Sequence, residues 1–357
     1  MSPLGKFFII LCAVWMLFVL LLYNSTHLSD NVHYYWNQNC FISPSNSDIR
    51  LLEEIDETSQ HRPSINESSK QIFFLETSCA QADGVIHLTA RQICAIESVA
   101  RWHPNHKIYV IFIAPVGIEM RKPEAELLRN LVKHENIYLR RANITKFAKN
   151  TPLEQFFDAQ EYRKSKFFNT HLSDILRFLT LYKYGGMYLD TDIVCLRNFE
   201  ELGMNFVAAE APTSLGSSVI NFGNDELGRI VALECLKELR STFDGSIWAH
   251  NGPGVLTRVI SRLCETTFTK LMTPEACSGF KVLSVETFAP VLWTYHKFYF
   301  QTENAKDVMK VVEKAYVIHL FNHMNKYIPV EKTSDVAYAL IAKKQCPDMF
   351  GSSSKTF

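Results

Sequence analysis

Short apolar runs alternate with stretches of helical period along most of the chain. Six runs rich in β-branched and aromatic residues are typical of buried strands: QIFFLETS, KIYVIFIAP, MYLDTDIVCL, FVAAEAP, KVLSVETF and AYVIHLFN. Between and after them, apolar residues recur every three or four positions, which predicts helices at 91–102, 123–134, 170–183, 226–241 and 253–264. This alternation predicts an α/β fold with a mainly parallel sheet.

The helix at 170–183 is well defined by its sequence. Its apolar stripe runs from Ile175 to Tyr182, and Gly185 is the expected stop signal at its end. Asp174 and Arg177 are three positions apart and therefore share one face. The usual outcome for such residues is an ion pair. A second interpretation is a carboxylate and a guanidinium held side by side to bind sugar hydroxyls or a phosphate.

The N-terminal pattern differs from the rest. Residues 7–23 contain no charge, a length at the short end of what spans a bilayer. A cleaved signal peptide is the alternative, but no small-x-small site follows the run, which favours an uncleaved anchor. Lys6 is the charge that precedes it, so we expect residues 1–6 in the cytoplasm and the remainder in a lumen.

Residues 24–70 are polar and show little periodicity, which is typical of a stem, and residues 71–357 are the predicted lumenal domain. The chain is 47% hydrophobic, enough for a full-sized core. Lys plus Arg and Asp plus Glu both number 37, so the net charge is zero and a nucleic-acid partner is not expected.

Cysteines and sequons agree with a lumenal location. Eight of the nine cysteines follow the predicted anchor, an even set that an oxidising compartment could pair, although the sequence leaves the connectivity open. N-x-S/T sequons begin at Asn24, Asn66 and Asn143, and Asn24 is close to the predicted membrane. We therefore expect glycans at Asn66 and Asn143.

Two aspartates interrupt an apolar, strand-like run directly after two glycines. Gly185 and Gly186 allow a sharp turn and a close approach of a ligand to the backbone. Asp190 and Asp192 then follow at the end of the strand, where α/β sheets bind ligands. Their like charges predict a divalent cation between them, shared with the oxygens of a diphosphate.

Other readings of this motif remain. An EF-hand loop fails, because Val194 and Cys195 occupy positions that need an oxygen ligand and a glycine. An aspartyl phosphohydrolase with Asp190 as nucleophile fits the pattern DTDIV, but its downstream acidic pair is not evident. A non-catalytic sugar-binding protein is a third hypothesis. The chain has no G-x-x-x-x-G-K-[ST], G-x-G-x-x-G, H-E-x-x-H or G-x-S-x-G motif.

The segment SDILRFLTLYKYGGMYLDTDIVCL resembles the signature of glycosyltransferases that carry a sugar-binding D-x-D region. Further blocks resemble, in the same order, the alpha-1,4-glycosyltransferase family, which includes lactosylceramide 4-alpha-galactosyltransferases and alpha-1,4-N-acetylglucosaminyltransferases: FFLETS, AIESVARWHPNHKIYVIF, TPLEQFF, GSIWAHNGPGVLTRV, VLSVETFAPVLW and AYVIHLFNH. Together they cover residues 71–346, nearly the whole predicted lumenal part.

This resemblance implies a nucleotide-diphospho-sugar transferase (GT-A, Rossmann-like) fold with a mixed, mostly parallel sheet. It further implies Mn²⁺, a UDP-sugar donor, retention of anomeric configuration and a type II Golgi membrane protein. The implied substrate is the terminal sugar of a glycosphingolipid such as lactosylceramide, which would receive galactose or an N-acetylhexosamine. Ser217 and Ser218 replace an asparagine and a small residue that are common in the family, so the donor sugar stays open.

The resemblance also implies roles for individual residues. Metal ligands would be Asp190, Asp192 and His319. Donor-binding residues would be Asp174, Arg177, Gly186, Tyr188, Asp190, Trp248, His250 and Gly252. Without the resemblance, His319 reads as a core histidine and Trp248 as a core tryptophan beside a Gly-Pro turn. The catalytic set is Asp190 and Asp192, with Glu210 as a candidate nucleophile if retention involves a covalent intermediate.

Overall fold

The computed structural model describes residues 67, 69–78, 87–113 and 125–357. The predicted tail, anchor and nearly all of the stem lie outside these residues, as do the sequons at Asn24 and Asn66. Within the described part, no helix combines the length and apolar character needed to cross a bilayer. The domain boundaries therefore stay a prediction.

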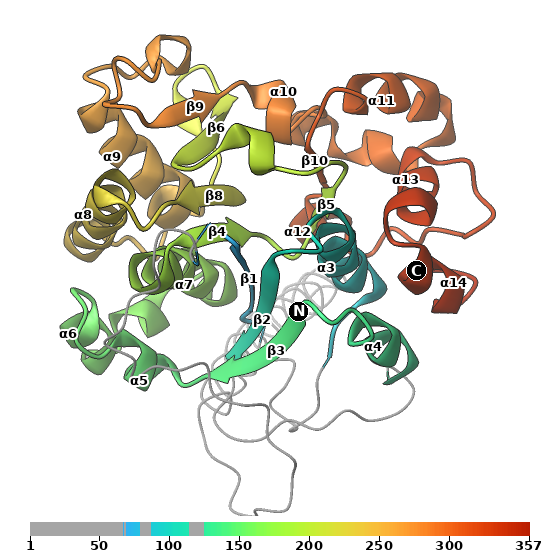
Figure 1. Ribbon diagram of the computed structural model, residues 1–357, viewed down its shortest axis with the longest axis horizontal. Helices are drawn as coiled ribbons and strands as arrows, with labels where there is room; N and C mark the ends of the chain where they lie inside the picture. Colours follow the sequence, from blue (N-terminus) through green and yellow to red (C-terminus); the bar gives the residue numbers. More distant parts are fainter. Residues whose placement is uncertain (1–66, 68, 79–86, 114–124) are drawn as a thin grey trace, which may run out of the picture.

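The centre of the fold is a mixed sheet of eight strands (Figure 1). Its order is β3 (Ile137–Ala142), β2 (Lys107–Ile113), β1 (Gln71–Glu76), β4 (Gly186–Leu189), β8 (Val219–Phe222), β6 (Phe206–Ala211) and β7 (Ser214–Leu215), and β9 (Lys281–Leu283) also pairs with β6. Strands β3, β2, β1 and β4 run parallel, whereas β8 is antiparallel to both of its neighbours. The predicted α/β architecture with a mixed, mostly parallel sheet is confirmed.

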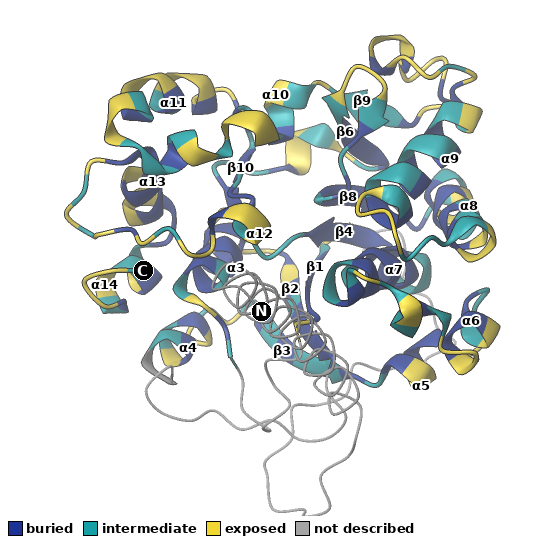
Figure 2. Cartoon of the chain, turned by 180° about the vertical axis from the view of Figure 1, so that it is seen from behind, coloured by how far each residue is buried: buried dark blue, intermediate teal, exposed yellow. Residues whose placement is uncertain are grey.

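Alternating residues of the central strands fill two separate cores. In β1, Ile72 and Phe74 belong to one core, and Phe73 and Leu75 belong to the other. This alternation follows from the two-residue period of a strand and requires cover on both faces. Figure 2 shows the resulting concentration of buried residues in the central strands and in α7.

Helices supply this cover. One face carries α3 (Ala90–Trp102), α4 (Ala125–Leu131), α11 (Ala305–Val312), α13 (Ala337–Gln345) and α14 (Pro347–Ser352). The other carries α5 (Ile144–Ala148), α6 (Glu154–Asp158), α7 (Phe168–Tyr184), α8 (Glu226–Thr242) and α9 (Val255–Leu263). Figure 1 shows α3 and α4 across the sheet from α5, α6 and α7. The five predicted helices correspond to α3, α4, α7, α8 and α9.

The run MYLDTDIVCL is not one strand as predicted. It divides into β4 and β5 (Ile193–Cys195), and β5 leaves the central sheet to pair with β10 (Val317–His319) in a sheet of two strands. The physical reason is the pair of aspartates. Charged side chains are unfavourable inside a continuous buried strand, so Asp190 and Asp192 lie in the turn between β4 and β5.

Two further differences concern strands. KVLSVETF forms β9 and then turns into α10 (Val285–Phe288), because Ser284 adopts the extended conformation of a helix N-cap. Strands β3 and β8 lie outside the six runs predicted to be strands. Two arginines interrupt the apolar pattern of β3, and β8 is only four residues long.

Two disulfides join Cys94 to Cys346 and Cys264 to Cys277. Cys195 and Cys235 are buried free thiols, so the expectation that all eight cysteines could pair is wrong for these two. Each packs as a small apolar residue in a different core. Asn143 caps α5, with its side-chain Oδ1 accepting hydrogen bonds from the backbone amides of Thr145 and Lys146.

The two disulfides should differ in their contribution to stability. They close loops of 252 and 13 residues, for which chain-entropy reasoning gives about 5.5 and about 3 kcal/mol. We expect Cys94→Ser/Cys346→Ser to lower the free energy of unfolding more than Cys264→Ser/Cys277→Ser. Chemical denaturation of the two double variants measures this difference, and an equal or reversed order would contradict it.

Candidate functional site

Gly185 and Gly186 connect helix α7 to strand β4, which leads to the site. Helix α7 ends at Gly185, with φ of 65°, and Gly186 follows with φ of 90°. Both values lie in the region that favours glycine, so the chain reverses sharply into β4. Since β4 is parallel to β1, its carboxyl end carries Asp190 to the edge where ligands bind in α/β sheets. Gly186 itself lies at the opposite end of β4.

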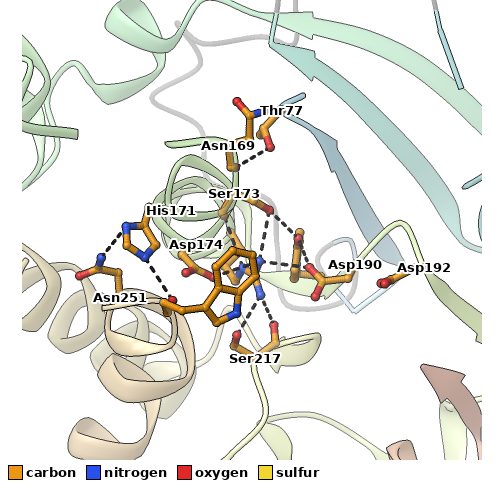
Figure 3. A network of polar contacts seen from close by, with 12 residues as sticks. Thr77, Asn169, His171, Ser173, Asp174, Asp190, Asp192, Ser217 and Asn251 are labelled. Atoms are coloured by element: carbon orange, nitrogen blue, oxygen red, sulfur yellow. Dashed lines mark hydrogen bonds and ion pairs between the residues drawn. The ribbon is translucent and has the colours of Figure 1, made fainter. Parts of the chain in front are cut away.

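Arg177 is the centre of a buried polar network, and its partners Ser173, Asp174, Asp190 and Ser217 are labelled in Figure 3. Its Nη2 lies 3.1 Å from Oδ1 of both Asp174 and Asp190, and its Nη1 donates to the Ser217 carbonyl oxygen at 2.6 Å. Ser173 and the hydroxyl of Ser217 complete its contacts. Burial alone would lower the pKa of Arg177, but nearby carboxylates, Asp190 foremost, raise it above its usual value. The guanidinium therefore stays charged and holds two carboxylates at the site.

Asp174 has a buried oxygen with no partner. Its Oδ1 meets Arg177, whereas Oδ2 has no hydrogen bond from any described residue. Burial raises the pKa of Asp174 to about 7, even though Arg177 lowers it. An orphaned buried carboxylate oxygen is costly unless a ligand supplies a donor, so this atom suits a hydroxyl group.

Gly252 is in direct contact with Asp174. A Cβ atom at position 252 would lie 2.2 Å from Asp174 Oδ1. Gly252 belongs to the π-helical turn His250–Gly254 that precedes α9. The absence of a side chain at this position therefore allows the turn to approach the carboxylate.

Tyr188 holds Asp190 in place through its side-chain hydroxyl. Its hydroxyl donates to Asp190 Oδ1 at 2.5 Å and contacts the Ser173 hydroxyl at 3.0 Å. The Arg177 guanidinium lies 4.7 Å from the centre of the Tyr188 ring. Burial raises the pKa of Tyr188 well above its usual value, so the phenol remains a donor. The ring thus fixes the orientation of the first aspartate.

Asp190, Asp192 and His319 form a group with the character of a metal site. Each offers one ligand atom, and these atoms all lie within 4.8 Å of one another. His319 Nε2 is 3.3 Å from Asp192 Oδ1, and the Asn322 amide donates to Asp192 Oδ2 at 2.8 Å. Two carboxylates and one imidazole suit divalent cations such as Mn²⁺, so the residues present fit the predicted ion.

A second group of possible ligands is better explained as structural. Glu97, His134 and Asp348 also lie close together. However, the two carboxylate oxygens of Glu97 accept the backbone amides of Asp348 and Met349, at the start of α14. Glu97 therefore caps a helix, and the Asp190 group is the stronger candidate.

The structure separates Trp248 from His250. The Trp248 ring lies 4.2 Å from the His323 ring at a tilt of 36° and meets the Phe167 ring edge-on at 5.1 Å, and 37% of the residue is exposed. The His250 imidazole instead contacts the Thr242 carbonyl oxygen at 2.8 Å, at the end of α8. Trp248 is thus partly exposed, and its donor-binding role stays a prediction, while the His250 ring is directed toward α8.

Glu210 lies near the carboxyl end of β6. It lines a small pocket together with His319, Phe321 and Ser218. Burial raises the pKa of the Glu210 carboxyl, and the proximity of Asp190 adds to this effect. The structure therefore places this candidate nucleophile close to the group of predicted metal ligands.

Several residues at the site were not identified from the sequence. Ser173 and Asn322 lie inside or beside the quoted motifs, but nothing in their spacing predicts their contacts. Buried His171 contacts Ser165, Asn251 and the Trp248 carbonyl oxygen, which positions the loop that carries Trp248. Asn251 lies between the predicted site residues His250 and Gly252, and this position was the signal from which it could have been identified.

Gly252→Ala tests the contact with Asp174. The new methyl group would displace the carboxylate, and overpacking of this kind costs about 1–3 kcal/mol. We expect Gly252→Ala to lower the thermal stability and, to a greater extent, the activity. Thermal unfolding measures the first effect and kcat/KM measures the second. Gly351→Ala is the matched control, because no atom lies within 4 Å of its added methyl group. Equal effects of the two substitutions would contradict this interpretation.

Two family models match separate regions of this chain. Residues 89–208 match the family description "Glycosyltransferase sugar-binding region containing DXD motif", and residues 225–353 match "Alpha 1,4-glycosyltransferase conserved region". Human lactosylceramide 4-alpha-galactosyltransferase is 28% identical over 285 residues, which are 80% of this chain and 78% of that protein. Human alpha-1,4-N-acetylglucosaminyltransferase is 25% identical over 77% of this chain and 78% of that protein. The solved structure of PaToxG glycosyltransferase has a TM-score of 0.41 at 15% identity, covering 71% of this chain and 93% of that one.

Proposed function

Because the chain belongs to the alpha 1,4-glycosyltransferases with a DXD sugar-binding region, we propose that it transfers a hexose from a UDP-sugar to the terminal sugar of a glycosphingolipid. The transfer would retain the anomeric configuration and use Mn²⁺. Galactose is the preferred donor sugar in this proposal, since relatives that are 28% identical over 77–80% of this chain are named lactosylceramide 4-alpha-galactosyltransferases. The family assignment also argues for the GT-A fold.

One observation carries the proposal: two carboxylates and an imidazole meet beside a buried carboxylate with a free oxygen. Asp190, Asp192 and His319 would hold the cation, which when bound offsets the charge of the donor diphosphate. The unpaired Asp174 Oδ2 would accept a hydrogen bond from a hydroxyl of the donor sugar. Arg177 keeps Asp174 and Asp190 in place, and Gly252 borders the same carboxylate.

In the reaction, the acceptor hydroxyl oxygen forms a bond to the anomeric carbon as the bond from that carbon to the diphosphate breaks. The hydroxyl proton passes to the departing diphosphate. Retention follows either from attack on the face that the leaving group vacates or from two successive displacements, with Glu210 as the candidate nucleophile of the second route.

The location is part of the proposal. Residues 7–23 would anchor the chain in the Golgi membrane, and the stem would hold the site near the lumenal leaflet, where glycolipid headgroups are presented. The family assignment replaces the hypothesis that the chain is an aspartyl phosphohydrolase with Asp190 as its nucleophile.

The structure offers a further argument against that hypothesis. The Arg177 guanidinium forms an ion pair with Asp190 and fixes this carboxylate in the buried network.

The experiment is a transfer assay on the full chain, expressed through the secretory route and purified in detergent. We would measure UDP release with Mn²⁺, lactosylceramide and each of three donors: UDP-galactose, UDP-N-acetylgalactosamine and UDP-N-acetylglucosamine. Acceptor-dependent release with one donor supports the proposal and identifies the donor. Folded protein that binds UDP and Mn²⁺ without any release would favour the non-catalytic sugar-binding protein.

A further inference from the structure

A small pocket opens beside the proposed metal ligands. One wall comes from the end of β6 with Glu210, a second from Ser218 and Val219, and a third from Phe288, Leu292 and Trp293. His319 closes it on the side of Asp192. The backbone carbonyl oxygen of Ser218 also accepts a hydrogen bond from the backbone amide of Asp190 at 2.9 Å. Through Ser218 and His319, the pocket therefore adjoins the site described above.

We propose that the terminal hexose of the acceptor binds over the mouth of this pocket, with the sugar stacked on Trp293 and a hydroxyl that reaches into the pocket bound by Glu210. This inference rests on the proposed function and adds the second substrate to it. The acceptor would then lie on the Glu210 side of the metal ligands, and the donor sugar would lie on the Asp174 side.

Trp293 has the exposure and the support that a sugar platform needs. It is 54% exposed although its neighbours Phe288 and Val291 are buried, so the fold leaves a large aromatic side chain in solvent at the pocket. It begins the 3₁₀ segment Trp293–Phe300. This segment is tied to α12 (Asn322–Asn325) by His296 Nδ1 and Asn325 Oδ1 at 2.6 Å. A hexose presents an apolar face of C–H groups, which stacks on an indole while its hydroxyls remain solvated or bound.

Glu210 is the carboxylate among the residues that line the pocket, and the backbone directs it there. Ala209 pairs with Leu215 and Ala211 pairs with Ser214, so Glu210 is an extra residue in the ladder between β6 and β7. Such a bulge redirects a side chain, and bulges are frequent next to binding sites. The half-buried carboxylate is therefore available to accept hydrogen bonds from sugar hydroxyls.

Trp293→Ala tests the platform in the full-length enzyme. With lactose as the acceptor and the donor that the wild type uses, we expect KM for lactose to rise about tenfold while kcat changes by less than about threefold. Tyr295→Ala is the matched control, because Tyr295 is 53% exposed, two positions away and outside the pocket lining. An unchanged KM, or an equal rise in the control, would overturn the inference.

Lactose also separates sugar binding from lipid binding. If Trp293 stacks on the hexose, its replacement weakens the use of lactose and of lactosylceramide alike. A defect that appears only with lactosylceramide would mean that the ring contacts the lipid, and this result would overturn the inference.

Glu210→Gln distinguishes hydroxyl binding from nucleophilic catalysis. A binding role predicts a higher KM for lactose, with the slow hydrolysis of the UDP-sugar in the absence of acceptor retained. Loss of this hydrolysis as well would assign Glu210 to the donor reaction and contradict the inference.

Direct binding keeps the inference testable even if the proposed function fails. Saturation-transfer NMR would measure contact between the protein and lactose in the presence of UDP and Mn²⁺. Signal transfer to lactose in the wild type, reduced in Trp293→Ala and unchanged in Tyr295→Ala, supports the pocket whether or not turnover is observed. No transfer in the wild type would overturn the inference, whereas failure of the proposed function appears separately, as an absence of UDP release.

Discussion

Replacing Asp192 by asparagine should lower kcat/KM for sugar transfer by about a thousandfold. The variant keeps the shape of the side chain and an oxygen for the Asn322 amide, but it removes the negative charge that His319 and the cation would share. Loss of a group that stabilises a leaving anion costs about 10²–10³ in rate, and the weaker hold on the metal adds to this. The measurement is UDP release as a function of Mn²⁺ concentration, together with UDP affinity with and without Mn²⁺.

The control for this substitution is Asp348→Asn, which changes a carboxylate of the second, structural group. It should leave the Mn²⁺ dependence unchanged. If Asp192→Asn retained activity within tenfold of the wild type, at the same Mn²⁺ requirement, the assignment of Asp190, Asp192 and His319 as metal ligands would be wrong.

Replacing Arg177 by methionine should lower the free energy of unfolding by about 3–5 kcal/mol, because it leaves two buried carboxylates without their cation. Donor use should be lost as well, since Asp174 and Asp190 would move apart or take up protons. Arg177→Lys should recover only part of the stability, because an ammonium cannot contact both carboxylates and the Ser217 carbonyl oxygen in the same way. Chemical denaturation of both variants measures this order.

The destabilisation in Arg177→Met should increase with pH. Burial raises the pKa of Asp174 to about 7 against the opposing effect of Arg177, so removal of the guanidinium raises it further. A carboxyl with a raised pKa in the folded state favours folding below its unfolded pKa, and this contribution is lost as the pH rises through the folded pKa. The variant should therefore lose more stability at pH 8 than at pH 5.

Arg258→Met provides the comparison for an ion pair near the surface. Arg258 pairs with Glu238, which retains a second partner in Arg262. Its replacement should cost about 1 kcal/mol or less. A similar cost for Arg177→Met would mean that the buried network contributes little to the stability of the fold.

The sequence was sufficient for those parts of the fold whose local signals agree with their tertiary context. Helix α7 has a continuous apolar stripe and ends at a glycine with positive φ, so pattern and structure coincide. Strand β3 carries Arg140 and Arg141 and was not predicted, since its placement depends on pairing with β2. No local rule indicates that β5 pairs with a strand more than a hundred residues later, because such pairing is decided by long-range packing.

The site was predictable where chemistry is concentrated in short motifs. The structure brings together Asp174, Arg177, Asp190 and Gly252, which the sequence placed in two separate blocks. His250 shows the limit of such reasoning, because its neighbour Gly252 reaches the carboxylate while its own ring contacts α8. Trp293 ends the quoted block VLSVETFAPVLW, but no role was assigned to it, because only the fold shows that this exposed tryptophan lies beside a pocket.

The pairing of β5 with β10 has a consequence for synthesis of the chain on the ribosome. Asp192 and the amide of Asn322 that binds it are 130 residues apart, and His319 lies on the later strand. A nascent chain that has produced the DXD motif therefore has only part of the proposed set of metal ligands until β10 has emerged. Closure of the Cys94–Cys346 disulfide requires a still later segment. Prematurely terminated products that end before Val317 would contain the complete DXD motif yet lack His319, the third proposed metal ligand, so the proposed activity would appear only after nearly the whole polypeptide has been made.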